Sequence, residues 1–205
     1  DNTLVVFTND NGGPGYIGLP DINKPFRGWK ISQFEGGIRV PLMMKWPARI
    51  PAGSISEVPV THIDMMPTLT AAAEAELPPE VVIDGKNLLP LATTRGDDKG
   101  HIEWSRDTLF WQSGHYRVVR HKDWKLQVAD RPKKQWSFNL AVDPTEQNNL
   151  ATQEPTKLAE LLALLEAHAA AAVPRRYPPV TEFPIAIDKT LAEPFADRDE
   201  HISWP

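Results

Sequence analysis

One stretch near the start of the chain decides the expected fold: Leu4-Val5-Val6-Phe7-Thr8-Asn9-Asp10-Asn11-Gly12-Gly13. Its first four residues form an unbroken apolar run that ends in a polar, glycine-rich turn, which is typical of a strand buried on both faces of a parallel sheet. In open α/β sheets, ligands bind at the carboxyl ends of the strands, where Asp10 and Asn11 lie. Their oxygens suit a hard divalent cation, but such residues also form ordinary turns. This stretch alone leaves both interpretations open.

Composition restricts the classes of partner. The chain has 205 residues, of which 41% are hydrophobic, and a net charge of −5, which argues against a nucleic-acid partner. No apolar run approaches the ~20 residues of a membrane span. Cysteine is absent, so disulfides, thiolate metal sites and cysteine nucleophiles are excluded. There is no signal-peptide pattern. Because Asp1 stands just before a buried strand, we expect the chain to be part of a longer protein.

A long segment without periodicity follows, over residues 13–37, and long loops inside compact domains are usually functional. Lys30 lies in this segment. On the residues alone it is either a cation that holds an anionic substrate or a solvated surface lysine. Glu35 and Arg39 flank a double glycine near its end, and we expect both side chains to brace the loop.

The next elements are a strand over residues 40–46 and a helix over about 63–74. Thr61 and Asp64 have the spacing of a capping box at the start of this helix. Apolar residues then recur at helical spacing, so we expect the helix to cover one face of the sheet. His62, beside the helix start, is expected to be structural. Residues 76–106 are expected to be mostly loop.

The C-terminal part predicts a second, smaller sheet. Short extended runs at 108–111, 116–121, 124–128 and 136–138 are separated by hairpin turns, which favours an antiparallel arrangement. A leucine stripe after Pro155 predicts a helix packed against this sheet. From Pro174 on, six prolines in 32 residues argue against regular structure, and we expect this tail to lie along the surface.

Five segments stand out in order along the chain. They are Asp10-Asn11-Gly12, Gly28-Trp29-Lys30 with Glu35-Gly36-Gly37-Ile38-Arg39-Val40-Pro41, Thr61-His62-Ile63-Asp64-Met65-Met66-Pro67-Thr68-Leu69, Tyr116-Arg117-Val118-Val119-Arg120 with Asp123-Trp124-Lys125-Leu126, and Asn139-Leu140 with Asp143-Pro144 and Asn149-Leu150-Ala151. Taken together, they resemble the C-terminal half of the sulfatases, which are arylsulfatase-like enzymes of the alkaline phosphatase superfamily. The resemblance covers roughly residues 2–172.

The resemblance implies an α/β fold. Residues 1–100 would form the C-terminal part of an alkaline phosphatase-like α/β sandwich, the large catalytic domain. Residues 101–173 would form a small antiparallel sheet packed on a C-terminal helix. Residues 174–205 would be the proline-rich tail packed on the surface.

The resemblance also implies a sulfuric ester hydrolase that acts on a sulfate ester. Asp10 and Asn11 would be ligands of one Ca²⁺, completed by residues upstream of this chain, and Lys30 would be the catalytic lysine that binds the sulfate. Sulfatases use a formylglycine made from Cys/Ser-x-Pro/Ala-x-Arg, and no serine here stands in that pattern. We therefore expect the chain to be inactive without the N-terminal half of the enzyme. The residues themselves do not indicate a compartment, and the resemblance implies a periplasmic or secreted location.

One further residue and two alternative functions stay open. His115 lies in the predicted hairpin turn after Gln112, and because turns often carry function we expect it at the mouth of the substrate site; the alternative is an exposed turn histidine. A phosphatase or phosphodiesterase of the same superfamily is one alternative, although those relatives tend to show Asp-His-Gly after this strand and bind paired zinc. A non-catalytic binding module is the other. The sequence upstream of Asp1 would distinguish them.

Overall fold

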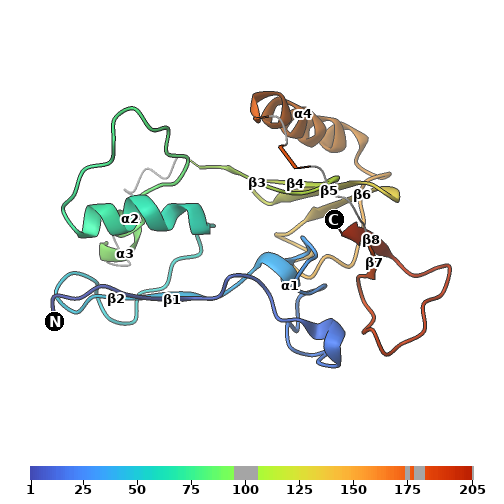
Figure 1. Cartoon of the computed structure of the whole chain (residues 1–205), viewed down its shortest axis with the longest axis horizontal. Coiled ribbons are helices and arrows are strands. Elements are labelled where there is room, and N and C mark those ends of the chain that lie inside the picture. Colours follow the sequence, from blue (N-terminus) through green and yellow to red (C-terminus); the bar gives the residue numbers. More distant parts are fainter. Residues whose placement is uncertain (95–105, 174–175, 178–182, 205) are drawn as a thin grey trace. The chain divides into compact units, whose positions relative to one another are not determined.

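The computed structural model describes residues 1–94, 106–173, 176–177 and 183–204 (Figure 1). The chain divides into two compact units, Asp1–Thr8 with Pro41–Ser105 and Asn9–Val40 with Arg106–Pro205. Residues 9–40, which carry Asp10, Asn11 and Lys30, therefore group with the C-terminal part of the chain. The expected division differs here, since it assigns them to a domain of residues 1–100.

The first unit contains a two-stranded ribbon. Strand β1 (Val5–Thr8) pairs antiparallel with β2 (Leu42–Lys45). One face of the ribbon is half-buried, and on the other Val5, Phe7 and Met43 are 54%, 57% and 57% exposed. The expectation of a parallel strand buried on both faces is wrong for the described chain, because the single neighbour is antiparallel and nothing within these residues covers the outer face.

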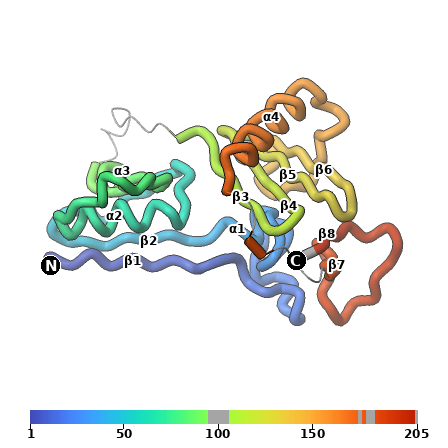
Figure 2. Tube along the Cα trace, turned by 45° about the horizontal axis from the view of Figure 1, so that its top comes forward, coloured from blue at the N-terminus to red at the C-terminus, as the bar shows by residue number. Residues whose placement is uncertain are grey.

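The helices of this unit lie on one side of the ribbon (Figures 1 and 2). They are the short 3₁₀ helix η2 (His62–Asp64), α2 (Met65–Ala72) and α3 (Leu89–Thr93). The predicted capping box is confirmed, since the Thr61 amide donates to Oδ2 of Asp64 at 2.8 Å. Helix α3 falls within residues expected to be mostly loop, and residues 95–105 lie outside the described ranges.

The expected inner face of α2 is exposed within this unit. Ile63, Met66 and Leu69 are 53%, 54% and 49% exposed. The helix lies on one side of the ribbon, as expected (Figures 1 and 2), but the apolar stripe is not the face of the helix that is buried within the described residues of this unit. Instead Thr68 and Asp64 are buried, because their polar atoms bind the backbone of Leu88 and Lys86 at 2.8 Å.

The second unit is built on the predicted four-stranded antiparallel sheet, which is confirmed. Its strands are neighbours in chain order and are joined by tight turns. They are β3 (Thr108–Ser113), β4 (Tyr116–His121), β5 (Trp124–Asp130) and β6 (Lys133–Asn139).

Helix α4 (Pro155–Ala171) covers one face of this sheet, as the leucine stripe predicted (Figure 1). Pro155 occupies the first turn, where a missing N–H costs no hydrogen bond. The residues that meet across this interface are apolar and buried: Leu161, Leu165, Val119, Leu126 and Val128. No helix among the described residues is long and apolar enough to cross a membrane.

The opposite face of the sheet is also covered. Strands β7 (Phe183–Ala186) and β8 (His201–Trp204) form an antiparallel hairpin there, next to the short helix α1 (Glu35–Ile38) (Figure 1). The core on this side contains Phe34, Ile187 and Ile202 packed on sheet residues. The short 3₁₀ helix η1 (Gly15–Ile17) precedes it in the chain.

The expectation that the tail lacks regular structure is wrong for the two short strands, Phe183–Ala186 and His201–Trp204, whereas residues 187–200 between them form no helix or strand. Pro184 is tolerated because β7 has β8 as its single neighbour, and proline is compatible with edge strands. Residues 174–175, 178–182 and 205, with four of the six prolines, lie outside the described part.

Candidate functional site

Asp10 and Asn11 form a polar turn just after β1. Asn11 Nδ2 donates a hydrogen bond to Asp10 Oδ2 at 2.8 Å, and Asp10 is exposed. The next amide, of Gly12, donates to the Gly37 carbonyl at 2.8 Å. A Cβ at Gly12 would lie 1.8 Å from the Gly36 carbonyl oxygen, so only glycine allows the two backbones to approach this closely.

The segment with Lys30 is fastened to the same turn. The Lys30 amide donates to the Gly13 carbonyl at 3.2 Å, two residues after Asn11. Asn23 secures the other side: its Oδ1 accepts from the Gly13 amide at 2.7 Å, and its Nδ2 donates to the carbonyls of Gly13 and Gly28 at 2.9 and 3.2 Å. The Lys30 side chain itself is exposed. The structure thus brings the Lys30 backbone beside the residues that follow Asp10 and Asn11.

The backbone on both sides of Lys30 is constrained. Trp29 is buried and packs so closely on Gly15 that a Cβ there would lie 2.3 Å from the indole ring. Ile31 has φ of 90°, a region that β-branched residues rarely adopt. Such conformations cost about 1–3 kcal/mol and persist only when surrounding contacts hold them, often at functional sites.

Asp10 and Asn11 fit a hard cation in the type of ligand they offer. Both supply side-chain oxygen atoms, which Ca²⁺ prefers, but Ca²⁺ takes six to eight such ligands. Among the residues that the structure describes, no three His, Cys, Asp or Glu side chains lie close enough to hold a metal ion. The turn therefore offers two ligands of the type that Ca²⁺ takes, and a site for this ion would need further ligands from elsewhere.

Behind the Lys30 segment lies a buried charge cluster that joins it to the sheet. Lys125 on β5 is fully buried, and its Nζ lies 2.9 Å from Oε1 of Glu35 and 2.9 Å from Oε1 of Glu146. The other Glu146 oxygen accepts the Glu35 amide at 2.5 Å, and Gln127 donates to Oε1 at 3.0 Å. Burial raises the pKa of Glu146, although the Lys125 charge and the Glu35 amide oppose this shift.

The prediction that Glu35 and Arg39 brace the loop is confirmed. Glu35 carries the ion pair with Lys125, and Arg39 Nη1 lies 3.7 Å from its second oxygen. The Arg39 guanidinium also stacks 4.6 Å above the centre of the Phe26 ring. The double glycine between them serves close packing, since a Cβ at Gly36 would lie 2.3 Å from the Gly28 carbonyl oxygen.

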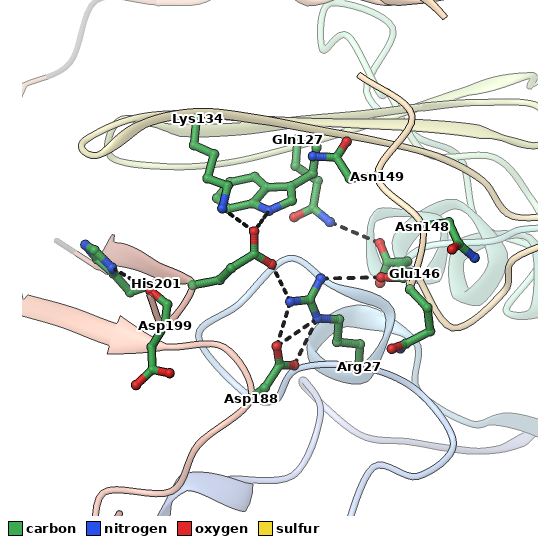
Figure 3. A network of polar contacts seen from close by, with 12 residues as sticks. Arg27, Gln127, Lys134, Glu146, Asn148, Asn149, Asp188, Asp199 and His201 are labelled. Atoms are coloured by element: carbon green, nitrogen blue, oxygen red, sulfur yellow. Dashed lines mark hydrogen bonds and ion pairs between the residues drawn. The ribbon is translucent and has the colours of Figure 1, made fainter. Parts of the chain in front are cut away.

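A second polar network surrounds Arg27 (Figure 3). Its guanidinium forms ion pairs with Asp188 at 2.6 Å and Glu200 at 2.5 Å, both from the C-terminal hairpin. Glu200 also binds Lys134 and accepts the Trp136 indole N–H at 3.2 Å. Partial burial disfavours the charge on Glu200, but the hydrogen bonds from Lys134 and Arg27 outweigh it and lower its pKa to about 2. Burial likewise opposes the charge on Arg27, yet its two carboxylate partners raise its pKa.

His115 lies in the turn between β3 and β4, as predicted. Its Nδ1 is 3.9 Å from Asp130 Oδ2, and the same carboxylate lies 3.8 Å from Arg117. These contacts lie within the sheet. A role for His115 at the substrate site stays a prediction.

Sequence reasoning missed Asn23, Arg27, Lys125 and Glu146 as residues that organise the site. Lys125 alternates with apolar residues along β5, which usually marks a solvent-facing position. The alternation correctly predicts that Lys125 and the apolar residues lie on opposite faces of the sheet, but it does not reveal that both of these faces are covered by other parts of the chain. Asn23 carries no distinguishing signal, because asparagine is common in loops.

Comparisons with known proteins agree on one family. The family described as "N-sulphoglucosamine sulphohydrolase, C-terminal" matches residues 28–171. The chain is 34% identical over 155 residues to the steryl-sulfatase of Rattus norvegicus, covering 72% of this chain and 26% of that protein. It is 32% identical over 180 residues to a sulfatase of Formosa agariphila, covering 80% of this chain and 31% of that protein.

A solved structure has the same fold. The crystal structure of Ps i-CgsB in complex with k-i-k-neocarrahexaose matches with a TM-score of 0.68 and 28% identity, covering 82% of this chain and 37% of that chain. The chain thus spans between 26% and 37% of the length of these relatives.

Proposed function

Because the chain belongs to the sulfatase family, whose C-terminal portion it matches, we propose that the complete protein is a sulfuric ester hydrolase and that this chain supplies part of its active site. The observation that carries the proposal is the backbone junction at Gly13. There the Lys30 amide binds the carbonyl that follows the Asp10–Asn11 turn, at 3.2 Å. One lysine and two side chains that can bind a cation are thereby joined in a single segment. Binding an anionic ester requires positive charge of this kind.

In this proposal Asp10 and Asn11 coordinate one Ca²⁺ through side-chain oxygen atoms, and residues outside this chain supply the other ligands. The bound ion would supply positive charge against the sulfate oxygens. Lys30 would donate its ammonium protons to the same sulfate, and a compact point charge suits a tetrahedral anion. Lysine and cation together would stabilise the negative charge that develops on the sulfate oxygens as the S–O bond breaks.

The nucleophile belongs to the remaining part of the protein in this account. The family resemblance implies a formylglycine made from Cys/Ser-x-Pro/Ala-x-Arg, and this sequence contains no such pattern. We assign the exposed apolar face of the β1–β2 ribbon to contact with that remaining part. Val5, Phe7 and Met43 are each more than half exposed there, and large apolar patches usually mark an interface.

The experiment is a kinetic comparison in the complete protein. Lys30→Ala should lower kcat/KM for a sulfate ester by about 10²–10³, the usual effect of removing a donor aimed at developing charge. Lys30→Arg should recover part of this, because a planar fork replaces a point donor poorly. The matched control is Lys24→Ala, since Lys24 lies in the same segment, is 69% exposed and pairs with the surface residue Asp21 at 2.7 Å.

Calcium affinity provides the second readout. Calorimetry should give the same calcium affinity for Lys30→Ala as for the unchanged protein, because lysine is not a calcium ligand. A loss of kcat/KM below threefold in Lys30→Ala, or a loss equal to that of Lys24→Ala, would contradict the role of Lys30.

A further inference from the structure

The C-terminal hairpin, residues 183–204, lies outside the residues 28–171 that match the family description. The match to the family description does not extend to it. It nevertheless contributes buried side chains to the same core as Phe34 of the Lys30 segment, namely Ile187 and Ile202, each 1% exposed. The hairpin is thus an integral part of the second unit.

Two carboxylates of this hairpin meet on one arginine of the Lys30 segment (Figure 3). Asp188 accepts hydrogen bonds from Nε and Nη2 of Arg27 at 2.9 and 2.6 Å, and Glu200 accepts a further one at 2.5 Å. The Arg27 side chain is 12% exposed, whereas Asp188 and Glu200 are 53% and 30% exposed, so the guanidinium is buried and its carboxylate partners face the solvent. An arginine that is hydrogen-bonded to carboxylates in this way has a fixed geometry, because the guanidinium group is planar and rigid.

Arg27 in turn fixes the backbone around Lys30. Its carbonyl accepts the Gly36 amide at 2.7 Å, and its guanidinium stacks 4.8 Å above the centre of the Phe34 ring. Nη1 of Arg27 also donates to the Glu146 carbonyl at 3.4 Å. Lys30 is three residues further along the chain, so Arg27 holds the segment just before Lys30, and the Gly13 junction holds it at the Lys30 amide itself.

We propose that the C-terminal hairpin is a positioning element for Lys30 and that it acts through the ion pairs of Asp188 and Glu200 with Arg27. A second contact supports this role, since the Leu191 amide donates to the Tyr16 carbonyl at 2.8 Å and so ties the hairpin to η1, next to the glycine on which Trp29 packs. The inference rests on the proposed function, because it requires Lys30 to bind the substrate.

The test is a double-mutant cycle in the complete protein. Asp188→Asn combined with Glu200→Gln removes both charges with little change in shape. It should lower kcat/KM for a sulfate ester between about 10- and 100-fold, the scale expected for a misplaced catalytic group. In a Lys30→Ala background the same pair of changes should lower it less than about threefold, because residues that act through one another are not additive.

One control and one further variant separate an effect on positioning from an effect on stability. Asp199→Asn removes the ion pair with Lys189 at 2.5 Å, which lies wholly within the hairpin, and should leave kcat/KM within about twofold. Arg27→Lys keeps the charge but not the fork, so it should lose part of the activity while keeping the fold. Hydrogen exchange of amides 27–38 should rise in the Asp188→Asn/Glu200→Gln variant and in Arg27→Lys, but not in Asp199→Asn.

The outcomes distinguish the two claims. An equal loss in both backgrounds, or unchanged exchange over residues 27–38, would overturn the positioning role and leave Lys30 as the sulfate-binding residue. A Lys30→Ala variant with undiminished activity would overturn the proposed function and this inference together. If the paired carboxylate variant does not fold, Arg27→Lys combined with Lys30→Ala completes the cycle, and the same two outcomes decide it.

Discussion

The buried lysine of the second unit gives the most demanding test of the packing. Lys125→Met keeps the length of the side chain and removes its charge. Lys125 is fully buried and lies 2.9 Å from a carboxylate oxygen of both Glu35 and Glu146, whose side chains are 4% and 0% exposed. The change therefore leaves the buried Glu146 carboxylate without its Lys125 partner, and it leaves Glu35 with the more distant Arg39, at 3.7 Å.

Removing one partner of a buried charge pair costs about 3–5 kcal/mol, because the remaining charge is no longer compensated. For a slope of about 2 kcal/mol per molar urea, the unfolding midpoint should fall by about 2 M. Lys24→Met is the control: this exposed lysine pairs with Asp21 at 2.7 Å, and exposed pairs contribute at most about 1 kcal/mol.

The loss of unfolding free energy in Lys125→Met should also depend on pH. Burial already raises the pKa of Glu146, and loss of the Lys125 charge raises it further. When a carboxyl group has a higher pKa in the folded than in the unfolded state, the folded protein loses stability as the pH rises through the folded pKa. Lys125→Met should therefore be less destabilised near pH 5 than near pH 8. A midpoint equal to that of Lys24→Met at both pH values would refute the description of this cluster.

Three further predictions concern the turn and the hairpin. Gly12→Ala should cost about 1–3 kcal/mol of unfolding free energy, measured by urea denaturation, because its Cβ would lie 1.8 Å from a backbone oxygen. The pKa of Glu200 is about 2 in the folded protein and 4.5 ordinarily, so ionised Glu200 should stabilise the folded state by about 1–2 kcal/mol after solvent screening. This stabilisation should be complete above pH 4.5 and should be lost as the pH falls toward 2, and Glu200→Gln should abolish the pH dependence. Asp10→Ala in the complete protein should weaken calcium binding in calorimetry at least tenfold, and an unchanged affinity would exclude Asp10 as a ligand.

Local patterns predicted much of the second unit. The four strands, their hairpins and the leucine-striped helix α4 follow from short alternating runs, turn residues and 3.6-residue spacing, all of which act within a few residues of the chain. The capping box at Thr61 and Asp64 is equally local. The prediction that Glu35 braces the Lys30 segment is confirmed, although the sequence did not identify its partner.

Features that depend on distant parts of the chain were not predicted. Lys125 is buried because residues 9–40 and the C-terminal hairpin cover the sheet face on which it lies, and neither packing is visible in the sequence of β5. For the same reason Arg27 could not be matched with Asp188, 161 residues away. The apolar run of β1 predicted full burial, but burial depends on neighbouring elements, and within the described chain only β2 pairs with it.

The central claim, that the complete protein cleaves sulfate esters, is tested most directly by paired substrates. Sulfate esters of an aryl alcohol, a sterol and an amino sugar are each compared with the phosphate ester of the same alcohol, using the complete protein with calcium. The account predicts turnover of at least one sulfate ester, with kcat/KM exceeding that of its phosphate counterpart and depending on Lys30. Preferential hydrolysis of the phosphate esters, or turnover of sulfate esters that persists in Lys30→Ala, would contradict it.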